Sequence, residues 1–111
     1  MWLFTSGGFV SIVASRDCQD DLIVRARVRN HLQALFPQAV ITETVDADYR
    51  FRTIVNRKVV RKFVTDQVSV IRYGNFKNSI SDPRYRSASN RVWGVMHELQ
   101  GMYSQYDDDN R

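Results

Sequence analysis

Four arginines form two pairs, and in each pair one apolar residue separates the two arginines. Arg25 and Arg27 form the first pair, and Arg50 and Arg52 form the second. Residues two apart in a strand point to the same side, so each pair lies on one strand face. If the two strands are neighbours in a sheet, four guanidinium groups share one surface. Arginine forks match phosphate oxygens and release counterions on binding, so the pattern predicts contact with nucleic acid or a nucleoprotein.

A second group of positive charges falls within six residues at the spacing of a helix face. Its members are Arg57, Lys58, Arg61 and Lys62. We include this group in the predicted nucleic-acid surface, because it either joins the arginine surface or forms a separate basic patch. A solvated helix face accounts for it equally well. The sheet arginines also have a structural explanation, since they can pair with Glu43 or with nearby aspartates.

The positive charge is concentrated in the middle of the chain. Residues 22–91 carry fourteen Arg and Lys against five Asp and Glu, whereas the rest of the chain carries two against seven. Aromatic side chains for base stacking are missing from the expected arginine face, because Tyr49 and Phe51 alternate with the arginines and should face the other side. No RNP-like, KH-like or zinc-finger motif occurs either, so we do not expect sequence-specific reading of bases.

Catalytic patterns are absent from the sequence. His31 and His97 have no cysteine or acidic partner in a catalytic arrangement, and no glycine-rich phosphate loop occurs. The weakest hypothesis is a small metal-dependent nuclease with Asp46 and Asp48 as ligands. Aspartates are also favoured in turns, where they hydrogen-bond to the backbone. We therefore expect a binding protein without enzymatic activity, and we assign no cofactor and no metal.

The elements that position these residues follow from the hydrophobic periodicity. Strands are predicted at residues 2–4, 9–14, 22–27, 40–45 and 49–55. Helices are predicted at residues 28–36, 57–71 and 83–103. Gly7 and Gly8 should supply positive φ angles to the first hairpin turn. Asn56 is the expected N-cap of the second helix, and Asp82 followed by Pro83 begins the third.

Hairpins and single helices alternate in this order, which predicts one α+β domain over residues 1–106. We expect a two-layer antiparallel sheet with helices on one face, ferredoxin-like or a close variant. Residues 107–111 are expected to form an acidic, disordered tail. No apolar segment approaches 20 residues and the start lacks the features of a signal peptide, so we expect a cytoplasmic protein with no membrane partner. The single cysteine, Cys18, cannot form an internal disulfide.

The third predicted helix suggests an alternative function. Its second half is rich in large, adaptable side chains, and we assign Trp93, Met96 and Tyr103 to a protein interface. Most of its apolar stripe is expected to pack in the core, whereas Trp93 lies beside the stripe. The alternative is therefore a protein-binding inhibitor or adaptor, expected to be dimeric, that uses this part of the helix. A homodimer seam is a separate use that the same side chains could serve.

Five segments, taken in their order, resemble a group of short, uncharacterised bacterial and phage proteins. They are WLF at residues 2–4, FVSIV at 9–13, DADYRFR at 46–52, NFK at 75–77 and RVWGVM at 91–96. The resemblance implies a bacterial or phage origin and carries no established activity. Small accessory proteins of that kind often act by binding, including as inhibitors of host defence nucleoproteins, and this association supports the protein-binding alternative.

Overall fold

The computed structural model describes residues 1–109 and the side chains of residues 1–104. The chain divides into two compact units, Met1–Arg72 (unit 1) and Tyr73–Arg111 (unit 2). This division differs from the single domain that the sequence predicts over residues 1–106. Each unit is described by itself below.

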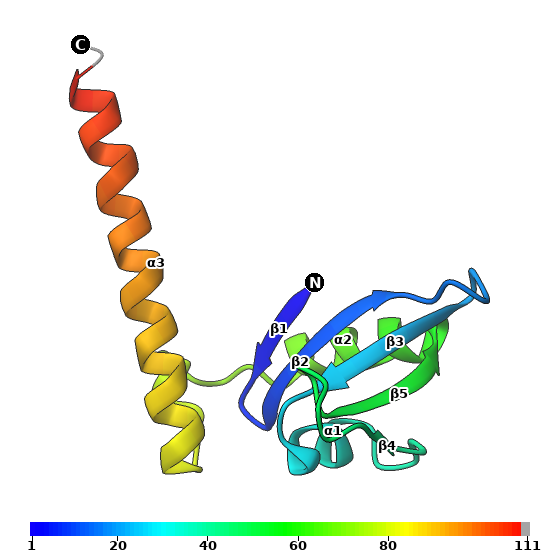
Figure 1. Ribbon diagram of the computed structural model, residues 1–111. Helices are drawn as coiled ribbons and strands as arrows, with labels where there is room; N and C mark the ends of the chain where they lie inside the picture. The colour runs from blue at the N-terminus through cyan, green and yellow to red at the C-terminus, as the bar shows by residue number, and fades with distance from the viewer. Residues whose placement is uncertain (110–111) are drawn as a thin grey trace. The chain divides into compact units, whose positions relative to one another are not determined.

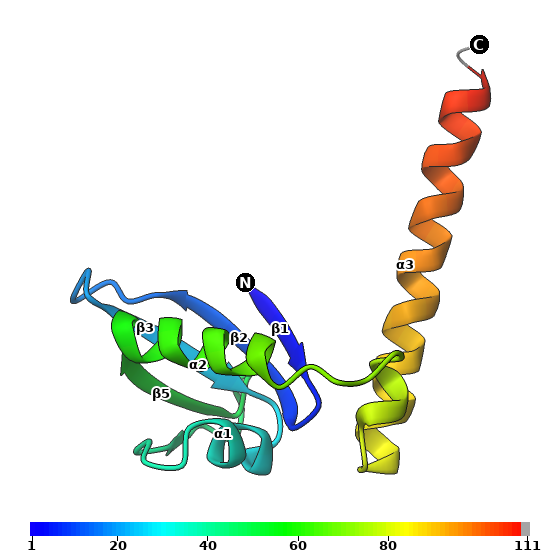
Figure 2. The same ribbon diagram turned by 180° about the vertical axis from the view of Figure 1, so that it is seen from behind.

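Unit 1 is an antiparallel sheet of five strands with two helices on one face (Figure 1). The strands are β1 (Trp2–Thr5), β2 (Gly8–Ala14), β3 (Asp21–Ala26), β4 (Thr42–Glu43) and β5 (Phe51–Asn56), in the spatial order β1-β2-β3-β5-β4. The helices are α1 (Arg29–Leu35) and α2 (Arg57–Ser69). Figure 2 shows α2 in front of the strands, on the face that Figure 1 views from behind. The predicted α+β class with a two-layer antiparallel sheet is confirmed.

The core fills the space between the sheet and the two helices. Period-two alternation turns one side of each central strand inward, and the helices add their own apolar stripes. The buried members are Val10, Ile12, Val24, Ala26, Leu32, Phe36, Phe51, Val60 and Phe63. The rings of Phe36 and Phe63 meet with centroids 4.6 Å apart, so the segment after α1 packs directly against α2. Full burial of an apolar side chain of this size stabilises the fold by roughly 1.5–3 kcal/mol.

The strand connections identify part of the sheet as a split β-α-β arrangement. β5 lies between β3 and β4, and α1 connects the two outer strands. The strand on the other side of β3 is β2, which comes before β3 in the chain instead of after α2. The ferredoxin-like topology is therefore not established.

β4 is much shorter than the strand predicted at residues 40–45. It pairs with β5 only through Thr42 with Arg52 and Glu43 with Phe51. Ala39 and Ile41 are instead partly buried against the core. The preceding segment thus leaves the sheet because its apolar side chains pack elsewhere.

The turn between β1 and β2 occurs where the sequence predicts it, but its backbone differs. No glycine in the described chain has a positive φ, so that expectation for Gly7 and Gly8 is wrong. Gly8 is required for space, because a Cβ there would lie 2.6 Å from His31 Cβ and 2.9 Å from His31 Cα. His31 is buried and its Nδ1 accepts a hydrogen bond from the backbone N–H of Phe9 at 3.1 Å. The histidine therefore links α1 to β2.

Unit 2 contains a short 3-10 helix, η1 (Lys77–Ser79), and the long helix α3 (Pro83–Asp109). The Asp82 carboxylate accepts a hydrogen bond from the N–H of Arg84 at 2.9 Å, as the predicted helix start requires. α3 continues beyond the predicted end near residue 103. Residues 107–109, predicted as a disordered tail, are helical, and residues 110–111 of that tail lie outside the described residues. None of the described helices combines the length and hydrophobicity needed to cross a membrane.

The segment before α3 folds back along its first turns. Nε and Nη2 of Arg86 both donate to the carbonyl of Ile80, at 2.9 and 2.6 Å. Nζ of Lys77 lies 3.3 Å from Oδ1 of Asn90 and 4.5 Å from the ring centre of Trp93. These contacts reach along α3 as far as Trp93.

Candidate nucleic-acid interface

The sheet face opposite α1 and α2, here called the open face, carries a row of side chains from four adjacent strands. Trp2 is the register partner of Ser11, and Ser11 is the partner of Arg25. Arg25 is in turn the partner of Arg52. Partners across antiparallel strands point to the same side, and strands lie about 4.7–4.9 Å apart, so the row spans roughly 14 Å. The two arginine-bearing strands are thus neighbours, as the sequence analysis requires.

Arg25 and Arg52 form the centre of the row. Nη2 of Arg25 donates to Oγ of Ser11 at 2.9 Å, and Nη2 of Arg52 lies 3.4 Å from the carbonyl oxygen of Tyr49. The Nε atom of each arginine is buried and has no hydrogen-bond partner among the described residues. Buried donors without an acceptor are uncommon in folded proteins. Two N–H groups at the middle of the open face therefore lack an acceptor.

Tyr49 lies with the arginines, and the prediction that it faces the helices is wrong. Its ring centre is 4.5 Å from Cζ of Arg25 and 4.4 Å from Cζ of Arg27. Tyr49 precedes the first residue of β5, so the strand alternation does not determine its direction. Phe51, which begins β5, is in the core as predicted. Cation–π contacts to Tyr49 thus hold two of the guanidinium groups in place.

Three of the four predicted sheet arginines carry uncompensated charge. Nη2 of Arg50 pairs with Oε1 of Glu43 at 2.7 Å, as the structural explanation in the sequence analysis allows. Arg25, Arg27 and Arg52 form no ion pair with any residue that the structure describes. Like charges held close together on a sheet repel one another. The open face is therefore a concentrated positive surface suited to an anionic ligand.

The basic cluster on α2 does not join the open face. Val60 and Phe63 turn α2 toward the core, which places the helix on the other side of the sheet. Part of the cluster is engaged within the protein: Nε and Nη2 of Arg57 donate to the carbonyl of Gln19 at 3.3 and 3.1 Å, and Lys62 pairs with Asp66 at 2.8 Å. The remaining members, Lys58 and Arg61, are exposed. The cluster is a separate patch.

The open face also carries an aromatic cluster, which the sequence analysis did not assign to a site. Phe4 is the register partner of Phe9, and their rings stack with centroids 4.5 Å apart. The indole of Trp2 meets Phe9 edge-on at 5.9 Å and is 67% exposed. Alternation within the first hairpin groups these three side chains on one face. Only the strand order of the sheet places that face with Arg25.

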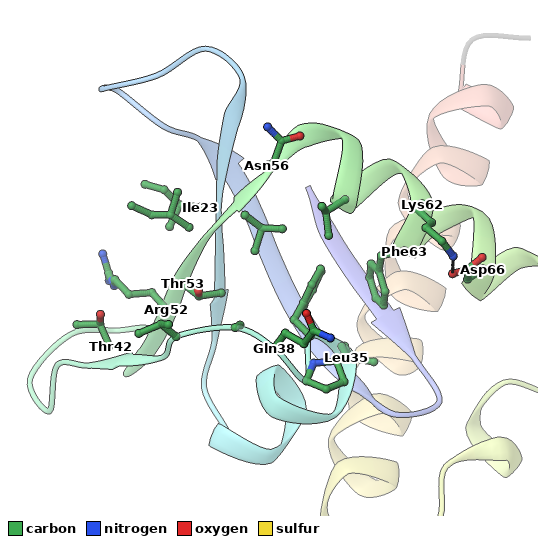
Figure 3. Close-up of a pocket in the computed structure, with 17 residues that line it drawn as sticks. Ile23, Leu35, Gln38, Thr42, Arg52, Thr53, Asn56, Lys62, Phe63 and Asp66 are labelled. Carbon is green, nitrogen blue, oxygen red and sulfur yellow. Dashed lines mark hydrogen bonds and ion pairs between the residues drawn. The ribbon is translucent and has the colours of Figure 1, made fainter.

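An apolar hollow of about 1030 Å³ lies where β4 ends and the edge of β5 is uncovered (Figure 3). Most of its lining side chains are aliphatic or aromatic, including Ile54, Val59 and Phe63. Its titratable groups are Arg52, Lys62 and Asp66, and the last two pair with each other. The hollow therefore offers no free pair of groups for acid–base chemistry.

The nuclease hypothesis gains no support from the side chains. Oδ1 of Asp48 accepts a hydrogen bond from the N–H of Tyr49 at 2.8 Å, so this carboxylate is engaged with the neighbouring backbone. Within residues 1–104, no group of three His, Cys, Asp or Glu side chains is arranged to hold a metal ion. Asp46 and Asp48 thus remain turn residues.

The residues predicted for a protein interface lie on the exposed half of α3. Trp93, Met96 and Tyr103 are 56%, 55% and 67% exposed. The apolar stripe that was expected in the core is also exposed there, through Val92, Val95, Leu99 and Met102. The core interpretation of this half is wrong, because the described part of unit 2 supplies no element to cover it.

Comparison with known proteins supplies no relative: no protein-family model, no curated protein and no solved structure matches this chain. The resemblance to short bacterial and phage proteins therefore stays a prediction.

Proposed function

We propose that unit 1 binds nucleic acid, free or within a nucleoprotein, through the open face of its sheet. The observation that carries this proposal is the grouping of Arg25, Arg27 and Arg52 without a carboxylate partner in the described chain. A phosphate chain would supply acceptors to several guanidinium groups at once. Each contact would also release counterions from the nucleic acid.

The form of the surface favours a polymer over a small anion. The charged groups are spread over two adjacent strands of an open sheet face, with Arg25 opposite Arg52, so a chain of phosphates can contact several of them at once. Tyr49 holds Arg25 and Arg27 side by side, so two donors are already oriented before a ligand arrives. Phosphate contacts of this kind fix the position of the ligand and carry no sequence information. The proposed binding is accordingly independent of sequence.

The test is fluorescence anisotropy of labelled single- and double-stranded DNA and RNA at low and near-physiological salt. The open-face variant is Arg25→Gln/Arg52→Gln, and the matched control is Lys58→Gln/Arg61→Gln, which removes the same charge from α2. We expect the open-face variant to lose affinity and to reduce the log–log salt slope by about 1.4–1.8, since each phosphate contact contributes about 0.7–0.9. Equal effects of the two variants, or no binding at low salt, would contradict the proposal. Circular dichroism should accompany the titrations, to check that each variant is folded.

A second candidate function is protein association through α3, and we assign a second copy of this chain as the partner. Val92, Met96, Leu99 and Tyr103 follow one another at alternating steps of four and three residues, the spacing of a two-helix seam. The neighbouring positions 93, 95, 100 and 102 carry no charge, whereas Arg91 and Glu98 lie outside this stripe. An uncharged apolar stripe is complementary to itself, because nothing in it repels an identical stripe. The inhibitor or adaptor alternative, which would use the same helix to bind another protein, stays a prediction.

A further inference from the structure

We infer that the open face binds single-stranded nucleic acid, with unpaired bases stacked on the aromatic cluster of Trp2, Phe4 and Phe9. The inference rests on the proposed nucleic-acid binding and adds the form of the ligand. Its starting point is the position of these rings, which lie on the arginine side of the sheet, away from the helices.

The aromatic and charged groups are continuous. Trp2 and Arg25 are both register partners of Ser11, one on each side of it, and the Ser11 hydroxyl is hydrogen-bonded to Arg25. A base on the indole would therefore be held about two strand spacings from the nearest guanidinium group, roughly 10 Å along the sheet. Surfaces that combine aromatic platforms with a basic track bind single strands with little sequence preference.

The rings are arranged to receive a flat ligand. Phe4 and Phe9 stack on each other, and Trp2 packs edge-on against Phe9. Trp2 remains 67% exposed at the outer strand of the sheet. A large part of the indole is therefore accessible for stacking with a base.

A duplex would leave this platform unused. In a double helix the bases are already stacked on one another, so a flat sheet face reaches the phosphates and not the faces of the bases. The arginines alone would therefore bind single and double strands by charge, without a base-dependent term. A preference for unpaired bases has to come from the aromatic cluster.

The experiment uses the full-length chain and four labelled probes of equal length. They are oligo-thymidine DNA with its uridine RNA counterpart, a DNA duplex, and a DNA oligomer of abasic sites that keeps the phosphates and lacks bases. Trp2→Ala is compared with Trp2→Phe, which keeps a ring at the same position. The Trp93→Phe protein leaves Trp2 as the single indole, so its fluorescence reports stacking directly.

We expect Trp2→Ala to weaken binding of the thymidine or uridine strand by roughly 5- to 150-fold, the range measured for one base–aromatic stack. Binding of the abasic oligomer by Trp2→Ala should not change. Indole fluorescence should be quenched by the base-containing strand and not by the abasic one. Trp2→Phe should retain most of the affinity, because it keeps a ring. The weaker binding expected for Trp2→Ala is then due to the missing ring and not to a loss of folding.

The outcomes separate this inference from the proposed function. If the abasic oligomer binds as tightly as the thymidine and uridine strands and Trp2→Ala changes nothing, the stacking inference is wrong while arginine-dependent binding stands. If no probe binds even at low salt, both are wrong. A duplex that binds more tightly than the single strands, with no dependence on Trp2, overturns the inference as well.

Discussion

The guanidinium group of Arg25 packs against the ring of Tyr49, with its Cζ 4.5 Å from the ring centre. The same side chain donates to Ser11, so it is held from two directions before any ligand binds. Ordering a free arginine at an interface costs about 0.5–1.5 kcal/mol, and a side chain that is already ordered avoids that cost. The tyrosine thus has a specific part in the proposed phosphate surface.

Replacing Tyr49 should test that part. We expect Tyr49→Leu to weaken nucleic-acid binding by about 2- to 12-fold for each arginine that it releases. Tyr49→Phe keeps the ring and should bind like the parent in the same anisotropy titration. Because Tyr49 is only 4% exposed, a urea denaturation curve should accompany each variant. Equal binding by the leucine and phenylalanine variants would contradict a positioning role for the ring.

Glu43 should lower the affinity of the open face for nucleic acid, because it neutralises Arg50. We expect Glu43→Gln to strengthen binding and to increase the salt slope by up to about 0.7–0.9, the contribution of one added phosphate contact. Arg52→Gln should reduce the slope by a similar amount, whereas Arg50→Gln should change it less. Titrations at several salt concentrations measure the three slopes. A larger loss with Arg50→Gln than with Arg52→Gln would show that the charged surface is assigned to the wrong residues.

The close contact at Gly8 should make it sensitive to a single added methyl group. Gly8→Ala places a Cβ 2.6 Å from His31 Cβ, so the backbone of β2 or α1 must shift, at a cost of roughly 1–3 kcal/mol. Gly7→Ala is the control, since its Cβ would meet the end of the Leu35 side chain at 3.2 Å and Oγ1 of Thr5 at an ordinary contact distance of 3.9 Å. Urea denaturation followed by far-UV circular dichroism gives both free energies of unfolding. Similar stability of the two variants would contradict the steric role of Gly8.

A charge placed in the α3 stripe should prevent self-association. Leu99→Glu introduces a carboxylate between Met96 and Tyr103, so two copies brought together would bury like charges. Sedimentation velocity over a range of concentrations should show dimer for the parent and monomer for this variant. Glu98→Gln lies outside the stripe and should associate like the parent. A parent protein that stays monomeric at the highest concentration rules out the second candidate function.

Acid should weaken the start of α3 through Asp82. The backbone N–H of Arg84 donates to its carboxylate and holds the pKa of Asp82 below its ordinary value. Because the pKa of Asp82 is lowered in the folded state, its carboxylate stabilises the start of α3 above the ordinary pKa. This stabilisation is lost as the pH falls through the lowered pKa of the folded state. The protection factor of the Arg84 amide, which is its NMR exchange rate compared with the intrinsic rate at the same pH, should therefore fall at acidic pH. Asp82→Asn should remove that pH dependence, and an unchanged profile in this variant would contradict it.

The sequence was sufficient to predict the side of the strand on which Arg25 and Arg52 each lie, because that side depends on local alternation. The cap at Asn56, whose Oδ1 accepts from the N–H of Lys58 at 2.9 Å, is equally local, whereas the adjacency of β3 and β5 that brings the two arginines together was only a condition. The predicted direction of the Tyr49 side chain is wrong because Tyr49 lies just outside β5, where alternation no longer applies. The strand predicted at residues 40–45 is too long because the burial of Ala39 and Ile41 depends on tertiary packing.

Two features of the candidate sites depend on information beyond local periodicity. The aromatic residues Trp2 and Phe9 join the arginine side only through the order of the strands, which no residue spacing specifies. The stripe on α3 has the same helical period whether it fills a core or stays exposed. Trp93 could therefore be recognised as unusual from the sequence, while the exposure of Val92 and Leu99 could not.

The two-residue length of β4 has a consequence for handling the protein at high concentration. Past Arg52, β5 has no second neighbouring strand among the described residues, and Ile54 on this edge is 64% exposed. An unpaired, apolar sheet edge is a template on which other chains add strands and begin to aggregate. Intermolecular sheet growth should therefore start at β5, and a lysine in place of Ile54 is the change that would protect the edge.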